Sequence, residues 1–143
     1  MGIFSSLFHR APPKTAVPGG QPRRDWPWTL DVGGTLWPDL DSWQMVSSQL
    51  RALNTEEQDS YLVLEQRDPQ DAKKYWFIQS ALARMGPTRG QYVLGVGWSA
   101  PEHNQLWETS VPDVDRVIGY FDEAFHHCRV DLTGFQDRSD MLP

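Results

Sequence analysis

The sequence has little of three features that would each mark a class of protein. It contains one cysteine, Cys128, which excludes an internal disulfide framework and is typical of a reducing compartment. Lys and Arg together number 13 against 19 Asp and Glu, so the formal net charge is −6 and nucleic-acid binding is not expected. No apolar run approaches the roughly 20 residues of a membrane-spanning helix. A cytoplasmic protein is therefore expected.

Aromatic residues, by contrast, are plentiful. Seven Trp, six Phe and four Tyr provide large apolar surfaces that can fill a core. A length of 143 residues fits one compact domain with a short extension.

Charge is divided unevenly along the chain. Residues 1–24 hold four basic residues and no acidic one, which leaves a net charge of −10 for residues 25–143. Residues 10–25 are rich in proline and glycine, a composition that disfavours a regular helix or an interior strand. We therefore expect residues 1–25 to form a flexible basic arm and residues 26–143 to form a single acidic domain.

The first ten residues have two interpretations. Ile3, Phe4, Leu7 and Phe8 fall on one face of a helix, so a short amphipathic segment could contact an anionic membrane surface. The start of the chain also matches the Met-Gly-x-x-x-Ser pattern for N-myristoylation. The alternative is a frayed terminus with no binding role.

The remaining sequence predicts an α+β fold. A helix over residues 41–53 with Asp41 as its N-cap is followed by four strand-like segments at 61–66, 74–81, 91–98 and 105–109. A second helix begins at Ser110 and carries an apolar stripe from Val114 to Cys128. Because the strand connections are too short for a crossover helix, we expect a helix, a four-stranded antiparallel meander and a helix, with both helices packed on one sheet face.

Two strings suggest chemistry without completing a catalytic or metal site. Asp31-Val-Gly-Gly-Thr-Leu is similar to phosphate-binding and phosphatase loops, but a glycine turn before the first helix explains it as well. In His126-His127-Cys128 the adjacent histidines point to different sides of a helix, so no metal site is expected. The sequence therefore predicts no catalytic residue, no metal and no cofactor.

A protein partner is the more promising expectation. Trp98 and Trp107 lie at strand ends beside turns, where an exposed tryptophan could anchor an interface. Acidic residues cluster nearby, at Glu102, Glu108 and Asp113, and would suit a basic partner. These five residues form the predicted partner-binding set, with burial in the core as the alternative for both tryptophans.

Three strings in succession resemble a known group of proteins: Tyr75-Trp-Phe-Ile-Gln79, Tyr92-Val-Leu-Gly-Val-Gly-Trp98 and Val117-Ile-Gly-Tyr-Phe121. They look like small bacterial, often actinobacterial, immunity proteins of polymorphic toxin systems, over about residues 39–137. The resemblance implies a non-enzymatic protein that binds and neutralises a cognate toxin. The alternatives are a chaperone-like protein of a secretion system that binds an effector, and a small hydrolase that uses Asp31.

Overall fold

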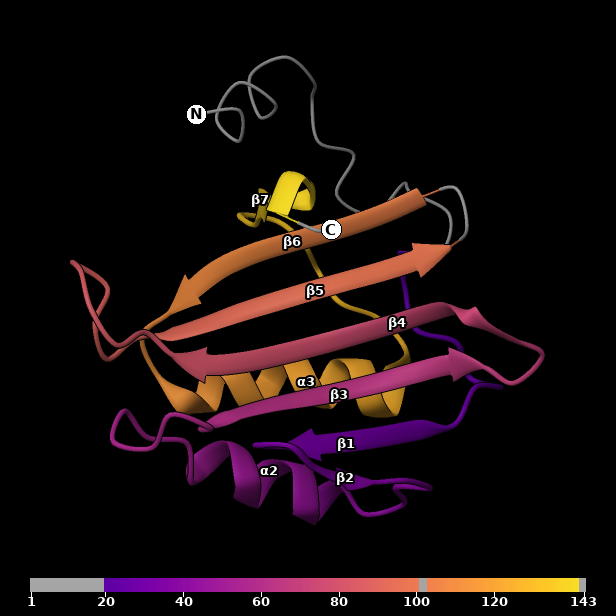
Figure 1. The fold of residues 1–143 in the computed structure, drawn as a ribbon, viewed down its shortest axis with the longest axis horizontal. Helices are drawn as coiled ribbons and strands as arrows, with labels where there is room; N and C mark the ends of the chain where they lie inside the picture. Colours follow the sequence, from indigo (N-terminus) through magenta and orange to yellow (C-terminus); the bar gives the residue numbers. More distant parts are fainter. Residues whose placement is uncertain (1–19, 101–102, 142–143) are drawn as a thin grey trace.

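The computed structural model describes residues 20–100 and 103–141, and these form one antiparallel sheet of seven strands with two α-helices (Figure 1). The strand order is β2-β1-β3-β4-β5-β6-β7. The strands are β1 (Trp28–Val32), β2 (Thr35–Trp37), β3 (Tyr61–Asp68), β4 (Asp71–Leu82), β5 (Tyr92–Ala100), β6 (His103–Val111) and β7 (Gln136–Asp137). The helices are α2 (Trp43–Arg51), α3 (Val114–His127) and a short 3-10 turn, η1 (Ser139–Met141).

The expected four-stranded meander between two helices is wrong. The four predicted strands exist as β3 to β6, and each is longer than its apolar core suggests. Three further strands extend the sheet: the β1–β2 hairpin beside β3, and β7 beside β6. β2 and β7 have only three and two residues, too few to show a periodic pattern, and they become strands because a neighbouring strand pairs with them.

The string that begins at Asp31 forms the β1–β2 hairpin and does not lead directly into a helix. Val32 pairs with Thr35, so Gly33 and Gly34 alone make the turn. Both glycines have positive φ, 57° and 95°, as a two-residue hairpin turn of type I′ requires. The Asp31 carboxylate accepts a hydrogen bond of 2.8 Å from the Gly34 backbone N–H. This contact gives Asp31 a structural role in the turn.

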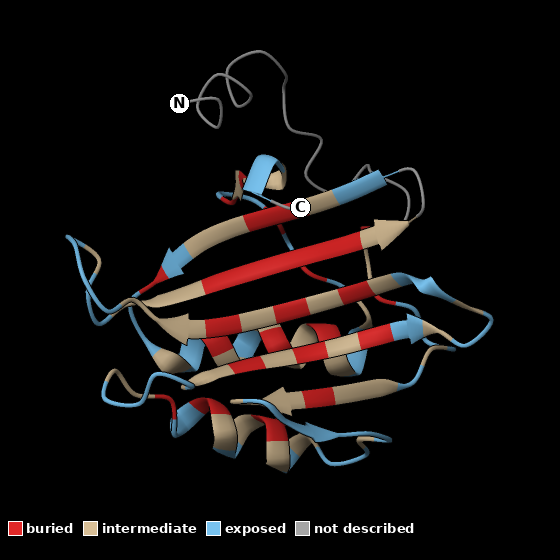
Figure 2. Ribbon diagram, viewed as in Figure 1, coloured by how far each residue is buried: buried red, intermediate tan, exposed pale blue. Residues whose placement is uncertain are grey.

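Alternation along the strands divides the side chains between two faces. On one face, which we name the covered face, lie the large apolar side chains of the core, among them Leu64, Trp76, Ile78 and Val96. Figure 2 shows the result as buried and half-buried residues that alternate along β3 and β4. Burial of each such side chain contributes about 1.5–3 kcal/mol.

Helix α3 provides most of the cover. It lies behind the sheet in Figure 1 and contacts β4, β5 and β6 through a stripe that includes the buried Val117, Phe121 and Ala124. α2 packs against α3 and touches β3. Both helices begin later than expected: Ser42 caps α2 in place of Asp41, and Asp113 caps α3 in place of Ser110, because these side chains accept the backbone N–H three residues ahead. No helix among the described residues is long and apolar enough to cross a membrane.

Residues 20–26, which we name the strap, cross the helix side of the domain and are held by two glutamines. Gln66 is fully buried in β3; its amide oxygen accepts the Arg23 N–H at 2.8 Å, and its amide nitrogen donates to the carbonyls of Arg23 and Trp26 at 2.6 and 3.1 Å. Gln21 binds the backbone of Val130 in the same double manner, at 2.7 and 3.2 Å. The sequence assigns residues 20–25 to the arm, whereas the structure packs them on the domain.

Replacing Gln66 tests the strap directly. Gln66→Ala is expected to lower the free energy of unfolding by about 1–3 kcal/mol, because three part-buried backbone groups of the strap lose their hydrogen-bond partner. Urea unfolding followed by tryptophan fluorescence measures the change. Gln44→Ala, at an exposed position of α2, is the matched control and should stay within about 0.5 kcal/mol of wild type. A loss for Gln66→Ala no larger than that of the control would show that the hydrogen bonds of Gln66 do not hold the strap on the domain.

Candidate functional site

The second face of the sheet, which we name the open sheet face, has no helix over it in the described part of the chain. It is the face turned toward the viewer in Figure 1, with α3 behind it. Its central side chains are mostly half-buried and belong to four adjacent strands. They are Tyr61, Val63, Glu65 and Arg67 of β3, Tyr75, Phe77, Gln79 and Ala81 of β4, Val93, Gly95, Gly97 and Ser99 of β5, and Leu106 and Glu108 of β6.

Two glycines of β5 shape this face. Gly95 and Gly97 pair with Gln79 and Phe77 of β4, whose side chains lean across the strand where no Cβ stands. A Cβ at position 97 would clash with the Phe77 ring and come within 2.9 Å of the Gln105 carbonyl oxygen. The aromatic ring therefore lies directly on the β5 backbone, and the Gln79 side chain lies against it at Gly95.

A row of stacked groups runs from β3 onto β4 and then along β4. The Arg67 guanidinium lies 4.7 Å from the centre of the Tyr75 ring, and Tyr75 stacks on Phe77 with centroids 6.2 Å apart. Glu65 fixes the other side of Arg67 through an ion pair of 2.9 Å. These contacts hold two aromatic rings in place on an exposed surface, which reduces the entropy that a binding partner would have to remove.

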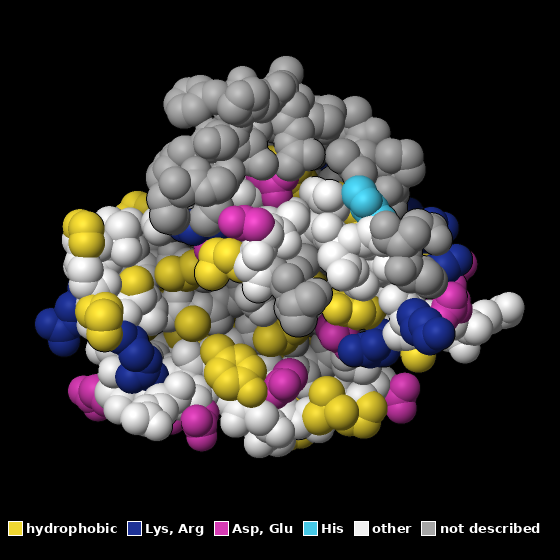
Figure 3. Space-filling view, turned by 45° about the horizontal axis from the view of Figure 1, so that its top comes forward, with side chains coloured by type: hydrophobic (Ala, Val, Ile, Leu, Met, Phe, Trp, Pro, Cys, Tyr) yellow, Lys and Arg dark blue, Asp and Glu magenta, His cyan; other side chains and the backbone are white. Residues whose placement is uncertain are grey.

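Two hollows lie on the open sheet face. The first, of about 230 Å³, is lined by Tyr61, Val63, Gln79, Ala81, Val93 and Gly95, with Ser80 at its edge. The second, of about 390 Å³, is more polar and adjoins it at Val93; Glu108 and Arg138 face each other there at 3.6 Å. Seen obliquely in Figure 3, hydrophobic side chains gather over the middle of the face, and basic side chains stand at its two sides. The geometry suits contact with another protein's side chains.

The structure places both predicted tryptophan anchors on the covered face, so the expectation that they are exposed is wrong. Trp98 and Trp107 are 5% and 4% exposed and belong to the core. The physical reason is register: Trp98 pairs with Trp76 and Trp107 with Val96, which places all four side chains under the helix layer. Neither indole N–H has an acceptor among the described residues.

The acidic members of the predicted set fall in three different places. Glu108 is on the open sheet face, as described above. Asp113 is exposed at the start of α3, where its carboxylate accepts the Arg116 N–H at 2.9 Å and acts as a helix cap. Glu102 lies outside the described residues, as do Ile3, Phe4, Leu7 and Phe8 of the proposed membrane contact. The structure therefore does not bring the predicted set together.

Residues that sequence reasoning missed make up most of the candidate surface. Tyr61, Val63, Phe77 and Val93 are apolar, and each stands next to a buried apolar residue in its strand. The alternation of side chains along each strand was the available signal in the sequence. It could not identify the exposed face, because a strand with apolar residues on both faces does not show which face a helix covers.

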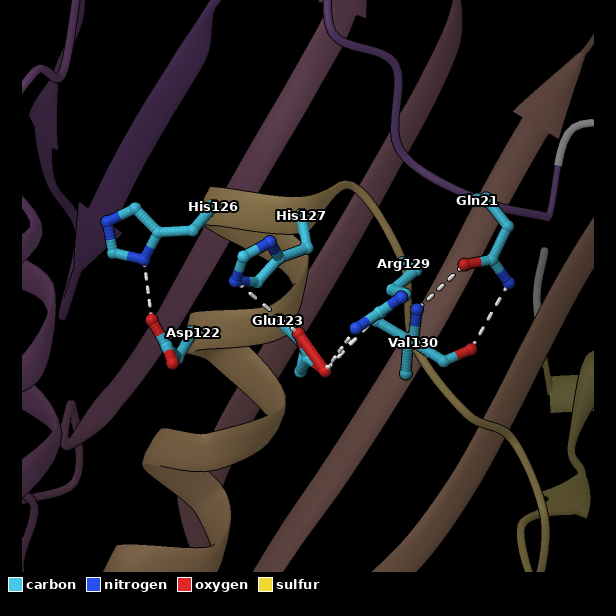
Figure 4. A network of polar contacts seen from close by, with 7 residues as sticks. All are labelled: Gln21, Asp122, Glu123, His126, His127, Arg129 and Val130. Atoms are coloured by element: carbon cyan, nitrogen blue, oxygen red, sulfur yellow. Dashed lines mark hydrogen bonds and ion pairs between the residues drawn. The ribbon is translucent and has the colours of Figure 1, made fainter.

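The histidine pair and the cysteine form no metal site. His126 and His127 each lie within ion-pair distance of the acid one turn earlier, Asp122 and Glu123 (Figure 4). Among the described residues no group of three or more His, Cys, Asp or Glu side chains is placed to hold a metal. Cys128 ends α3 in the left-handed conformation with φ 52°. Burial raises the pKa of its thiol, an effect that the positive charge of Arg24 partly offsets.

Comparisons with protein-family models, with curated proteins and with solved structures find no match for this chain.

Gly97→Ala should destabilise the protein, although alanine is usually preferred to glycine within a strand. The added methyl group meets the Phe77 ring and the fixed Gln105 carbonyl oxygen, so we expect a loss of about 1–3 kcal/mol in the free energy of unfolding. Gly119→Ala, in a helix with open space at that position, should instead gain about 0.5–1 kcal/mol. Urea unfolding compares the two variants, and equal effects of the same sign would contradict the proposed close approach.

The Cys128 thiol should react slowly because its pKa is raised in the folded protein. At pH 8 we expect alkylation by iodoacetamide to be slower in the folded chain than in urea, since only the thiolate reacts. The rate in the folded chain should keep rising beyond pH 9. Mass spectrometry follows the reaction, and a rate that levels off below pH 8.5 would show that burial does not hold the thiol protonated.

Proposed function

We propose that this chain is a non-enzymatic partner-binding protein and that the open sheet face is the surface that contacts the partner. The observation that carries the proposal is a sheet face with fixed aromatic rings, an apolar hollow and no helix over it in the described part of the chain. Antiparallel sheets often expose one face, but an exposed face is usually polar. An exposed face that carries Val63, Phe77 and Val93 gains free energy when another protein covers it.

The dimensions of this face match a protein interface. Four strands spaced about 4.8 Å apart and roughly nine residues long give an area of about 20 Å by 30 Å before side-chain relief. Stable interfaces bury about 800 Å² on each partner. The flat area of about 600 Å², with the margin at β1 and the relief of the side chains added, approaches the size of a specific interface.

The partner is proposed to be a basic protein domain of the toxin type. The net charge of −10 over residues 25–143 would speed association with a positively charged partner and orient it. The resemblance to immunity proteins supports a toxin as that partner. Inhibition would then come from physical cover of the toxin's working surface, and no chemical step by this chain is required.

Paired charge variants test the proposal. Tyr61→Lys and Val93→Lys place a positive charge in the apolar hollow, whereas Met85→Lys makes the same charge change at a residue 81% exposed outside this face. The ligand is the product of the neighbouring open reading frame, and isothermal titration calorimetry measures the affinity. We expect at least a tenfold loss for the two hollow variants and less than about twofold for Met85→Lys, with all three folded by circular dichroism.

Two outcomes would overturn the proposal. If the neighbouring product binds and all three variants bind it as wild type does, the open sheet face is not the contact surface. If no neighbouring product binds, the assignment as an immunity-type protein fails. A wild-type affinity that falls as salt is raised would support the basic character of the partner.

A further inference from the structure

A pocket of about 590 Å³ lies on the helix side of the molecule, between α3 and the chain that follows it. Gly119 and Tyr120 of α3 form one side, Val130 and Asp131 the other, and Gln21 of the strap closes one end. Small-molecule sites in proteins usually measure about 300–1,000 Å³. None of these residues belongs to the open sheet face, so the pocket is independent of the proposed partner surface.

Fixed contacts hold the walls of this pocket in place. Gln21 binds the Val130 backbone at 2.7 and 3.2 Å, and the Arg129 guanidinium contacts the Glu123 carboxylate at 3.2 Å, as Figure 4 shows. The Tyr120 ring meets Phe135 edge to face, with centroids 5.6 Å apart. The pocket is therefore formed in advance and requires little ordering when a ligand enters.

Gly119 leaves the helix side of the pocket bare. A Cβ at this position would meet no atom within 4 Å, so packing against the rest of the described chain does not require a glycine here. Glycine inside a helix costs about 1 kcal/mol relative to alanine. The missing side chain instead exposes the α3 backbone to the pocket and preserves its volume.

One positive charge at the pocket remains without a partner. Arg129 is paired with Glu123. The Asp131 carboxylate keeps its negative charge, because hydrogen bonds from the Thr133 hydroxyl and N–H hold its pKa below its usual range, and these bonds occupy its oxygen atoms. The Arg116 guanidinium, by contrast, makes no hydrogen bond or ion pair within residues 20–100 and 103–141, although it lines the pocket. Arginine binds carboxylates through charge-assisted, often bidentate hydrogen bonds.

We propose that this pocket binds a small amphipathic carboxylate, with its apolar body against Gly119, Tyr120 and Val130 and its carboxylate on Arg116. The apolar walls accommodate an aliphatic or aromatic body of moderate size. The Arg116 guanidinium, which has no partner within the described residues, favours an acidic headgroup over a neutral one.

Three ligands of one chain length test the chemistry: decanoate, its neutral amide decanamide, and decylammonium. Calorimetry measures affinity, and chemical shifts of backbone amides locate the site on the full-length protein. We expect decanoate to bind most tightly and to shift the amides of residues 116–123 and 129–131 most strongly. Arg116→Gln should weaken decanoate binding about tenfold and leave decanamide unchanged, as expected for loss of one charge-assisted hydrogen bond.

Substitutions at Gly119 test the location. Gly119→Leu should weaken decanoate binding at least about fivefold because its side chain takes up part of the pocket beside α3, and it should not lower the melting temperature, since leucine is the better helix former. Gly119→Ala should stay within about threefold of wild-type affinity. The control Val93→Lys, on the open sheet face, should bind decanoate as wild type does.

Several results would overturn this assignment. Decylammonium that binds as tightly as decanoate would show that Arg116 does not select the ligand. Decanoate affinity that Gly119→Leu leaves unchanged would place the ligand elsewhere. A change of oligomeric state in Gly119→Leu, seen by light scattering, would identify the pocket as a contact between two copies of the chain.

Discussion

The amount of helix available to cover the sheet determines which surfaces this molecule exposes. α3 has 14 residues, about 21 Å of helix, and α2 has only nine. Both pack on the side where Leu64, Trp76, Ile78 and Val96 project, so the opposite face of the sheet is left without a helical layer in the described chain. Because several strands carry apolar side chains on both faces, this asymmetric cover leaves Val63, Phe77 and Val93 half-exposed. The candidate binding surface is therefore the face of the sheet on which neither helix packs.

The covered side is completed by irregular chain, held mainly by side-chain amides. Gln66 and Gln21 each bind a backbone segment through both amide atoms, as a neighbouring strand would, and thereby attach the strap to β3 and to residue 130. The Trp76 indole N–H adds a bond to the Gly20 carbonyl. A buried glutamine is stable only because all of these polar groups are satisfied. The contact between Gln21 and Val130 also lines the pocket beside Gly119, so the strap connects the core to that pocket.

Part of this arrangement could be predicted from the sequence. The apolar runs identify β3 to β6, and the stripe from Val114 to Cys128 identifies α3. β2 and β7 could not be predicted, since two or three residues show no period and pairing alone makes them strands. The faces of Trp98 and Trp107 depend on register with Trp76 and Val96, which local sequence does not encode. Likewise, the role of Gln66 depends on hydrogen bonds to strap residues about 40 positions away in the sequence.

The central claim is that one face of the sheet is exposed and the other is not. Methyl NMR with a soluble paramagnetic probe tests it without knowledge of any partner, because the probe broadens only those methyl signals that it can approach. The account predicts strong broadening for Val63, Ala81 and Val93 and weak broadening for Leu64, Ile78 and Val96. Equal protection of the two sets would show that the open sheet face is covered, and would contradict the account.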